Sequence, residues 1–431
     1  MHASLENVGA LERRLTIRFP ATNLDARVHQ RMAELGRTVR LNGFRPGKVP
    51  SKVIEQRFGA QVRGEALSEL IGKTFEEAAT QHQLRPVANP SISTSGAPED
   101  GEIAYTATFE VMPELPAVDV SVLEIERVRA EASDADVDRM IETLRQQRRR
   151  FEPVGRPAGE GDFVAFDFSA QTSEGRYPEQ GSERAGSVLG SGSLMQEMDA
   201  AMAGHGTGET LELDVAFPSE FRNPALAGKL AQVRLNIAEV REPVLPELDA
   251  DFIRGFGVAD GEIEKFRSEV RANLERELHG ALLARLKGEV AQKLAAAHPD
   301  LELPKVMVEA EARAIARMGL PQGSEPGAEM VVAAYAPARL RVAAALLMGE
   351  IARRNGIAAD SKRIAEMLAA IASTYEEPQR VVELYRNDPQ LMEGLRNRVL
   401  EDQVAEWVAE HARVTDKPMS FDELLRPGRA G

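Results

Sequence analysis

Residues 43–50 read Gly-Phe-Arg-Pro-Gly-Lys-Val-Pro and separate two segments that have helical spacing. Segment 22–41, which precedes them, places apolar residues at helical intervals. Pro50 then opens a second helix, which we expect to end at Gly59. The sequence therefore predicts two helices joined by a turn that glycine and proline keep out of the helical conformation.

The turn carries one aromatic and two cationic side chains. Because it cannot continue a helix, we expect Phe44, Arg45 and Lys48 to project outward rather than enter a core. An ordinary connection between two helices is the alternative. Charge favours a docking role, since 12 Lys or Arg stand against 3 Asp or Glu between Arg13 and Arg63, whereas the whole chain carries −15. A basic stripe on an acidic protein suggests a polyanionic partner such as an RNA surface.

The spacing Gly43-Phe44-Arg45-x-Gly47-Lys48-x-Pro50 resembles the ribosome-docking signature of the trigger factor family, bacterial chaperones of the nascent-chain exit. The resemblance continues in Leu248-Asp249-x-x-Phe252 and in Leu303-Pro304-x-Val306-Met307-Val308, so it covers nearly the whole chain. It implies docking on the large ribosomal subunit through Gly43, Phe44, Arg45, Pro46, Gly47, Lys48 and Pro50. Family members often carry Lys in place of Pro46, so this turn has one charge fewer and is stiffer, and we expect docking to survive.

The composition predicts a cytoplasmic protein of several domains. A length of 431 residues exceeds what one core usually organises. The absence of cysteine excludes disulfides and thiolate chemistry and is compatible with a reducing compartment. The first residues contain no apolar signal core, and the longest apolar run, 342–348, is far shorter than the roughly 20 residues that cross a bilayer. We therefore expect no membrane insertion.

Periodicity predicts a multi-domain α+β protein. Leu15, Ile17 and Phe19 alternate in an opening strand, 103–111 alternates in a closing strand, and 134–149 has the spacing of a connecting helix. The expected parts are an α+β domain at 1–112, a linker at 113–150, a β-rich insert at 151–243 and a mostly helical domain at 244–431, and the resemblance implies ribosome binding for the first and a chaperone role for the last.

By resemblance, the β-rich insert is an FKBP-type peptidyl-prolyl cis-trans isomerase domain, with Val188-Leu189-Gly190-Ser191-Gly192 as a landmark. Rotation about an X–Pro bond crosses a barrier of about 18–20 kcal/mol and requires only a dry apolar pocket that favours the twisted imide. The family pattern places that pocket at Phe168, Tyr177, Leu194, Met195, Met198, Phe221 and Ile237. Plain core packing is the alternative for Phe168, Phe221 and Ile237.

The chain departs from the family pattern at the pocket floor. Family members typically read Ile-Pro-Gly-Phe-Glu, where this chain has Met195-Gln196-Glu197-Met198-Asp199. The aromatic floor and the Pro-Gly bend are absent, although methionine can still fill such a floor. We therefore expect the fold to persist and the isomerase activity to be weak or lost.

The chain after residue 245 is expected to be helical nearly to its end. Candidate helices cover 260–298, 304–319, 328–355, 360–374 and 390–412. Core packing is the ordinary explanation of their apolar stripes. In the trigger factor family this region makes two helical arms that enclose a cradle for unfolded chains, so the resemblance implies that some apolar positions face a cradle.

Metal and cofactor sites are not expected. The 7 histidines are scattered without metal-ligand spacing. Gly204-His205-Gly206-Thr207-Gly208 is superficially similar to a phosphate loop, but it lacks the Gly-Lys-Ser/Thr ending and precedes a predicted strand. Arg148-Arg149-Arg150 is interpreted as a solvated helix end rather than a second polyanion contact.

The resemblance thus implies an ATP-independent chaperone that acts in protein folding and export and binds nascent and unfolded polypeptides at the ribosomal exit. It is expected to use no nucleotide, and homodimerisation away from the ribosome is a family expectation. Three alternatives remain: a prolyl isomerase acting mainly as an enzyme, a nucleic-acid-binding protein that uses the basic stripe, and a ribosome-independent assembly chaperone.

Overall fold

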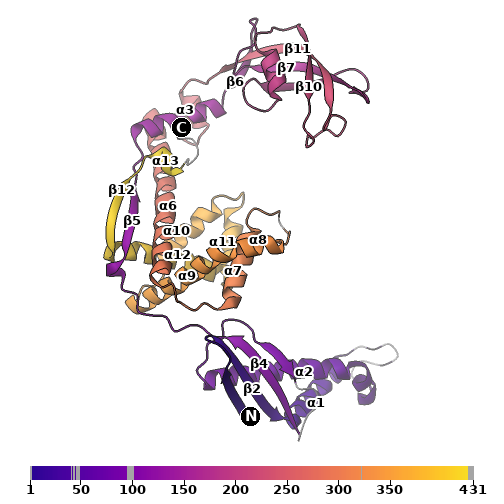
Figure 1. Cartoon of the computed structure of the whole chain (residues 1–431), viewed down its shortest axis with the longest axis vertical. Coiled ribbons are helices and arrows are strands. Elements are labelled where there is room, and N and C mark those ends of the chain that lie inside the picture. The colour runs from indigo at the N-terminus through magenta and orange to yellow at the C-terminus, as the bar shows by residue number, and fades with distance from the viewer. Residues whose placement is uncertain are drawn as a thin grey trace. The chain divides into compact units, whose positions relative to one another are not determined.

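The computed structural model describes residues 2–39, 41, 44, 49–94, 101–321 and 323–425 (Figure 1). The chain forms two compact units, one made of Met1–Arg129 with Leu282–Met419 and the other of Ala130–Ala281 with Ser420–Gly431. Helix α6 (Ile263–Ala297) contributes to both. The combination of an N-terminal α+β part, a β-rich middle and a helical C-terminal part confirms the predicted fold class.

An antiparallel sheet of four strands begins the first unit, in the order β1-β2-β4-β3. The strands are β1 (His2–Asn7), β2 (Glu12–Pro20), β3 (Ser91–Thr94) and β4 (Glu102–Glu110). The predicted alternation is confirmed, because Leu15, Ile17 and Phe19 of β2 are at most 1% exposed. Strand β1 precedes the predicted opening strand and was not expected.

Helices α1 (Ala21–Thr38) and α2 (Ser51–Gln81) form a hairpin beside this sheet. The expectation that the second helix ends at Gly59 is wrong, because glycine inside a helix costs only about 0.5–1 kcal/mol and packing outweighs that cost. A Cβ atom on Gly36 of α1 would lie 3.3 Å from Cδ1 of Ile54, so the helices approach closely there. Tyr105 of β4 anchors α2 to the sheet, since its hydroxyl lies 2.8 Å from Oγ1 of Thr74.

The rest of the first unit is a helical body with a short parallel strand pair. Its helices are α7 (Lys305–Arg317), α8 (Ala328–Ala333), α9 (Tyr335–Asn355), α10 (Ser361–Ala372), α11 (Pro378–Asn387) and α12 (Pro389–His411). Helices are present in all the expected segments, the segment 328–355 is divided into α8 and α9, and α11 is additional. Strand β12 (Arg413–Pro418), which was not expected, pairs in parallel with β5 (Glu124–Arg129), and a 3₁₀ turn at Val120–Val122 precedes β5. Among the described residues, none of the helices has both the length and the apolar composition for a membrane span.

The second unit contains a sheet of six strands. They are β6 (Arg150–Pro153), β7 (Phe163–Thr172), β8 (Gly175–Tyr177), β9 (Glu183–Val188), β10 (Thr210–Ala216) and β11 (Leu230–Val244). The central path runs β10-β11-β7-β8, with β6 paired to β11 and β9 paired to β7. One short helix, α4 (Gln196–Met202), packs into the core of this sheet through Met198 and Met202.

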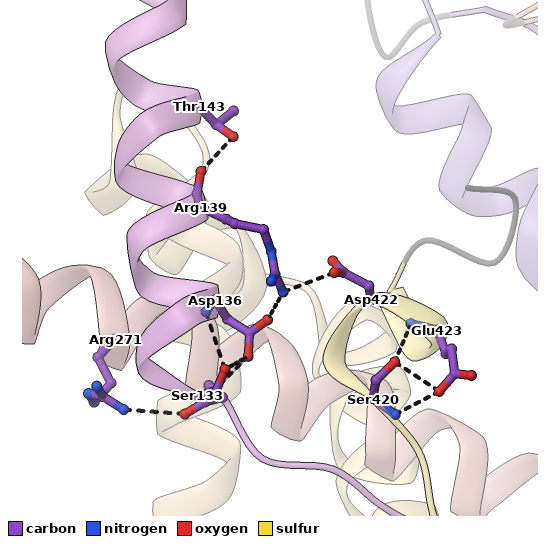
Figure 2. Close-up of polar contacts among 9 residues, drawn as sticks. Ser133, Asp136, Arg139, Thr143, Arg271, Ser420, Asp422 and Glu423 are labelled. Atoms are coloured by element: carbon purple, nitrogen blue, oxygen red, sulfur yellow. Dashed lines mark hydrogen bonds and ion pairs between the residues drawn. The ribbon is translucent and has the colours of Figure 1, made fainter. Parts of the chain in front are cut away.

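Helix α3 (Asp134–Gln147) precedes the insert and carries a network of polar contacts (Figure 2). Ser133 and Asp136 form a capping box, in which the Asp136 side chain accepts from the Ser133 backbone N–H at 2.8 Å. Arg139 lies between Asp136 and Asp422, and the Asp422 residue belongs to α13 (Phe421–Leu425). Burial opposes ionisation of Asp136, but the hydrogen bonds from Ser133 and the charge of Arg139 keep its pKa below the usual value.

The arginine run at the end of α3 is exposed, as expected, and also contacts aromatic rings. The guanidinium carbon of Arg148 lies 5.1 Å from the ring centre of Phe256, and that of Arg149 lies 5.3 Å from that of Phe151. Phe256 follows the short helix α5 (Ala250–Arg254). The run therefore ties α3 to its own unit through cation–π contacts.

Candidate functional site

The predicted docking turn lies between α1 and α2. Phe44 is 40% exposed, and its backbone N–H donates to the carbonyl of Leu41 at 3.1 Å. Pro50 is exposed at the start of α2. The other predicted docking residues, Gly43, Arg45, Pro46, Gly47 and Lys48, lie outside the described residues. An outward aromatic at the end of the hairpin agrees with the expectation for Phe44.

Part of the basic stripe is neutralised by acidic residues across the helical hairpin. Arg31 lies 3.1 Å from Glu69, and Arg63 lies 3.1 Å from Asp25. The hydrogen bonds that Arg27 and Arg31 donate to Glu69 hold the pKa of that carboxyl below its usual value. These five residues brace the two helices and leave other cations to face a partner.

Three exposed cations lie close to the turn in sequence. Arg37 is in the last turn of α1, Lys52 is in the first turn of α2 and Arg57 is one turn further on. None has an ion-pair partner among the described residues. The sequence argument counted them in the basic stripe without singling them out, because sequence does not tell a paired cation from a free one.

The seven predicted isomerase-pocket residues lie on or against one core of the β-rich insert. Ile237 pairs with Phe166 in the strand register, and Tyr177 pairs with Ala170. Residues directly opposite each other share a face of the sheet, and so do alternate residues of one strand. Phe168 therefore stands on the same face of the sheet as Tyr177 and Ile237.

Burial divides these seven residues into two groups. Met198 and Ile237 are 5% and 0% exposed, respectively, and belong to the core. The other five pack against that core and remain partly exposed: Phe168, Tyr177, Leu194, Met195 and Phe221. The arrangement is a buried apolar floor with a partly exposed apolar rim, so plain core packing accounts for only part of the set.

Asp199 joins the pocket loop to helix α4. One oxygen of its carboxylate accepts from the backbone N–H of Gly190 at 2.8 Å, and the other is buried and has no hydrogen-bond partner in the part of the chain that the structure describes. Leu194 and Met195 lie in the loop that this contact closes. From the sequence, Asp199 belongs to the altered floor, and no separate role was predicted for it.

The helical body of the first unit leaves several large apolar side chains exposed. They are Val306, Met318, Met330, Val332 and Tyr335 around α7 to α9, and Tyr375, Leu384 and Leu391 around α10 to α12. Val332 is 73% exposed and Met318 is 64% exposed. The predicted apolar stripes are mostly core, and these side chains lie outside it.

Comparison with known proteins covers both ends of the chain. Residues 1–144 match the model of the family described as bacterial trigger factor protein, and residues 262–410 match the model of its C-terminus. A solved structure titled "Promiscuous Substrate Recognition in Folding and Assembly Activities of the Trigger Factor Chaperone" aligns with 95% of this chain and 99% of its own, at 18% identity and a TM-score of 0.46.

Curated relatives match over the full length. The trigger factor of Stenotrophomonas maltophilia (strain R551-3) is 48% identical over 433 residues, which cover 99% of this chain and 100% of that protein. The trigger factor of Xanthomonas axonopodis pv. citri (strain 306) is also 48% identical, with the same coverage. The chain therefore belongs to the trigger factor family.

Proposed function

We propose that this ribosome-associated chaperone docks beside the nascent-chain exit of the large ribosomal subunit through the turn between α1 and α2. Full-length membership in the family carries this proposal. The exposed Phe44 supports it, and so do the cations Arg37, Lys52 and Arg57, which form no ion pair with any residue that the structure describes. An aromatic with cations close to it in sequence suits a ribonucleoprotein surface, because phosphates attract the cations and the aromatic ring adds apolar contact.

Emerging and unfolded polypeptides are the proposed clients, and the exposed apolar residues of the helical body are their proposed contacts. Each shallow apolar contact contributes about 25 cal/mol per Å² without sequence specificity. Release occurs when the client buries the same surface in its own core, so no nucleotide is required. We place the protein in the cytoplasm, as a homodimer away from the ribosome, and sedimentation analysis of the purified chain tests the dimer.

We divide the chain into a ribosome-binding domain at 1–112, a linker at 113–150, an isomerase domain at 151–243 and a chaperone domain at 244–431. The sheet of β1 to β4 and the sheet of β6 to β11 support the first and third parts. Pairing of β5 with β12 ties the proposed linker to the proposed chaperone domain. Limited proteolysis with mass spectrometry tests the boundaries.

The isomerase domain is proposed to retain its fold with weak or no turnover. Met198 supplies a flexible apolar floor in place of an aromatic one and Met195 a flexible rim, which together hold a twisted prolyl bond less rigidly. A prolyl-peptide assay tests this, and turnover comparable to that of an intact family member would contradict it.

The docking proposal is tested with Phe44, Arg45 and Lys48 all changed to Ala. A matched control changes one exposed apolar residue and two cations elsewhere in the N-terminal part, namely Ile92, Arg85 and Lys73. We expect the first variant to lose co-sedimentation with ribosomes and to keep its suppression of client aggregation, and the control to retain both. Unchanged co-sedimentation of the first variant would rule out the turn as the anchor.

A further inference from the structure

We propose that Asp199 is a positioning residue of the pocket in the β-rich insert. It fixes the loop at residues 190–195 and thereby holds Leu194 and Met195 at the pocket rim for a prolyl peptide. This inference rests on the proposed pocket and adds to it a residue outside the seven predicted positions. In this role Asp199 acts through the loop and does not touch the peptide.

Both ends of the loop are fixed in the insert. Leu189, which follows strand β9, accepts from the backbone N–H of Gly161 at 3.0 Å and donates to the carbonyl of Asp162 at 2.9 Å. At the other end, Met198 and Met202 bury helix α4 in the core. The conformation of the loop between these ends therefore depends on the contacts of the loop itself.

The loop has little intrinsic order. Gly190 and Gly192 have positive φ angles of 78° and 72°, and glycine loses more conformational freedom on folding than any other residue. Residues 191–193 are exposed, and the rim residues Leu194 and Met195 follow them directly. A loop of this composition needs a contact from outside to hold one conformation.

Asp199 supplies that contact from helix α4. One of its carboxylate oxygens accepts from the backbone N–H of Gly190 at 2.8 Å, which joins the first residue of the loop to the helix that follows the loop. A Cβ atom at position 190 would lie 2.8 Å from Cγ of Glu160, so this backbone also lies close to Glu160. A hydrogen bond to a carboxylate is stronger than one between neutral groups, so this contact can order the loop.

The stability of the insert does not by itself account for a carboxylate at position 199. The second oxygen of Asp199 is buried, and none of the residues described in the structure donates a hydrogen bond to it. A buried acceptor without a partner destabilises the folded state, and an apolar side chain would avoid that cost. Unsatisfied polar groups are rare in native proteins and are expected at functional sites.

An alternative role for Asp199 is to complement the dipole of α4, because Asp199 lies in the first turn of that helix. The two roles make different demands on the side chain. The dipole requires the negative charge, whereas the contact with Gly190 requires only an oxygen that accepts a hydrogen bond, which asparagine also has. The substitution Asp199→Asn therefore separates the two roles.

The test compares the full chain with Asp199→Ala, with Asp199→Asn and with the control Asp214→Ala, which removes an exposed acid from β10 of the same sheet. Affinity is measured by fluorescence anisotropy of a labelled tetrapeptide that contains Leu-Pro, and loop order is measured by amide hydrogen exchange. We expect Asp199→Ala to exchange faster in residues 190–195 while β7 and β11 stay protected.

Peptide affinity should follow the order of the loop. Asp199→Ala should bind the peptide about three- to tenfold more weakly, because affinity falls in proportion to the fraction of molecules whose loop is ordered. Asp199→Asn and Asp214→Ala should bind within about twofold of the parent, because both retain an acceptor for Gly190.

Four outcomes would overturn this role of Asp199: unchanged affinity of Asp199→Ala, equal losses in both Asp199 variants, faster exchange throughout β7 and β11 of Asp199→Ala, or no binding of the peptide by the parent. Isomerase activity is tested separately by the prolyl-peptide assay. Turnover comparable to that of an intact family member would contradict the proposed weak activity and leave the role of Asp199 standing.

Discussion

The same Leu→Ala substitution at a buried and at an exposed position of the helical body should separate the structural role of apolar residues from their proposed role in client binding. Leu347 of α9 is 0% exposed and belongs to a core with Val404 and Val408 of α12. Leu384 of α11 is 56% exposed. We expect Leu347→Ala to destabilise the body and Leu384→Ala to weaken client binding without changing stability.

Burial gives the two magnitudes. Removing a fully buried leucine side chain loses its transfer free energy and leaves a cavity, which together cost about 2–5 kcal/mol. Substitution of a largely exposed leucine usually changes the free energy of unfolding by about 0.5 kcal/mol or less. Full burial of a leucine side chain contributes about 1.5–3 kcal/mol, and roughly half of the surface of Leu384 remains for a client to cover. Removing this side chain should therefore weaken client binding by about 1 kcal/mol, or about fivefold.

The assay uses the single tryptophan of the chain, Trp407 of α12. Its ring packs against the same core as Leu347 and stacks on His411 at a centroid distance of 4.1 Å. Trp407 fluorescence during urea unfolding therefore reports the helical body. Suppression of aggregation of an unfolded client, titrated against chaperone concentration, reports client binding.

The two variants should differ from the parent in different assays. Leu347→Ala should lower the urea midpoint and, at temperatures where it remains folded, suppress aggregation as the parent does. Leu384→Ala should keep the midpoint and require more chaperone for the same suppression. Equal destabilisation by both variants would refute the burial argument, and unchanged suppression by Leu384→Ala would remove Leu384 from the client surface.

Three further predictions concern helix capping, pH and the pocket floor. Ser133→Ala removes the α3 cap and should destabilise the helix by about 1 kcal/mol, which is measured as faster amide hydrogen exchange in α3. Unchanged exchange would show that the cap does not stabilise α3. Hydrogen bonds from two neighbouring arginines of α9 lower the pKa of Glu350 to about 2, so its stabilisation is present above its ordinary pKa and is lost as pH falls toward 2. Glu350→Gln should therefore be less stable than the parent at about pH 7, and the difference in their free energies of unfolding should shrink below about pH 4.5. A difference that does not change with pH would refute this. Met198→Phe should raise prolyl-peptide turnover by restoring an aromatic floor, while Met202→Phe, also in the core, should not.

Sequence predicted best those elements whose own residues determine them. Strand β2 alternates strictly between buried and exposed residues and helix α3 has a capping box, so the sequence predicted both near their observed positions. Strand β12 was missed because its sequence, Arg-Val-Thr-Asp-Lys-Pro, contains one apolar residue and depends on pairing with β5, far away in the chain. The predicted helix end at Gly59 was wrong because distant contacts decide it as well. Packing of α2 against α1 and the sheet keeps the helix intact past this glycine.

The candidate sites were predictable to different degrees. The existence of a turn between α1 and α2 followed from glycine and proline, and its docking role stays a prediction, whereas the pairing of Arg31 and Arg63 across the hairpin required the fold. The pocket positions came from resemblance alone, because a residue of a pocket and a residue of a core have the same apolar chemistry.

If the exposed apolar residues of the helical body bind clients, as proposed, they also link client binding to the proposed self-association. Eight of them are scattered around α7 to α12, and each is worth about 1 kcal/mol when covered, so a few simultaneous contacts give weak and reversible binding. The same side chains are available to a second copy of the chain, because apolar contacts are not directional. A client and a second copy should therefore compete, and Leu384→Ala should weaken both the dimer and client binding. A variant that loses client binding while its dimer remains intact would show that the two use different surfaces.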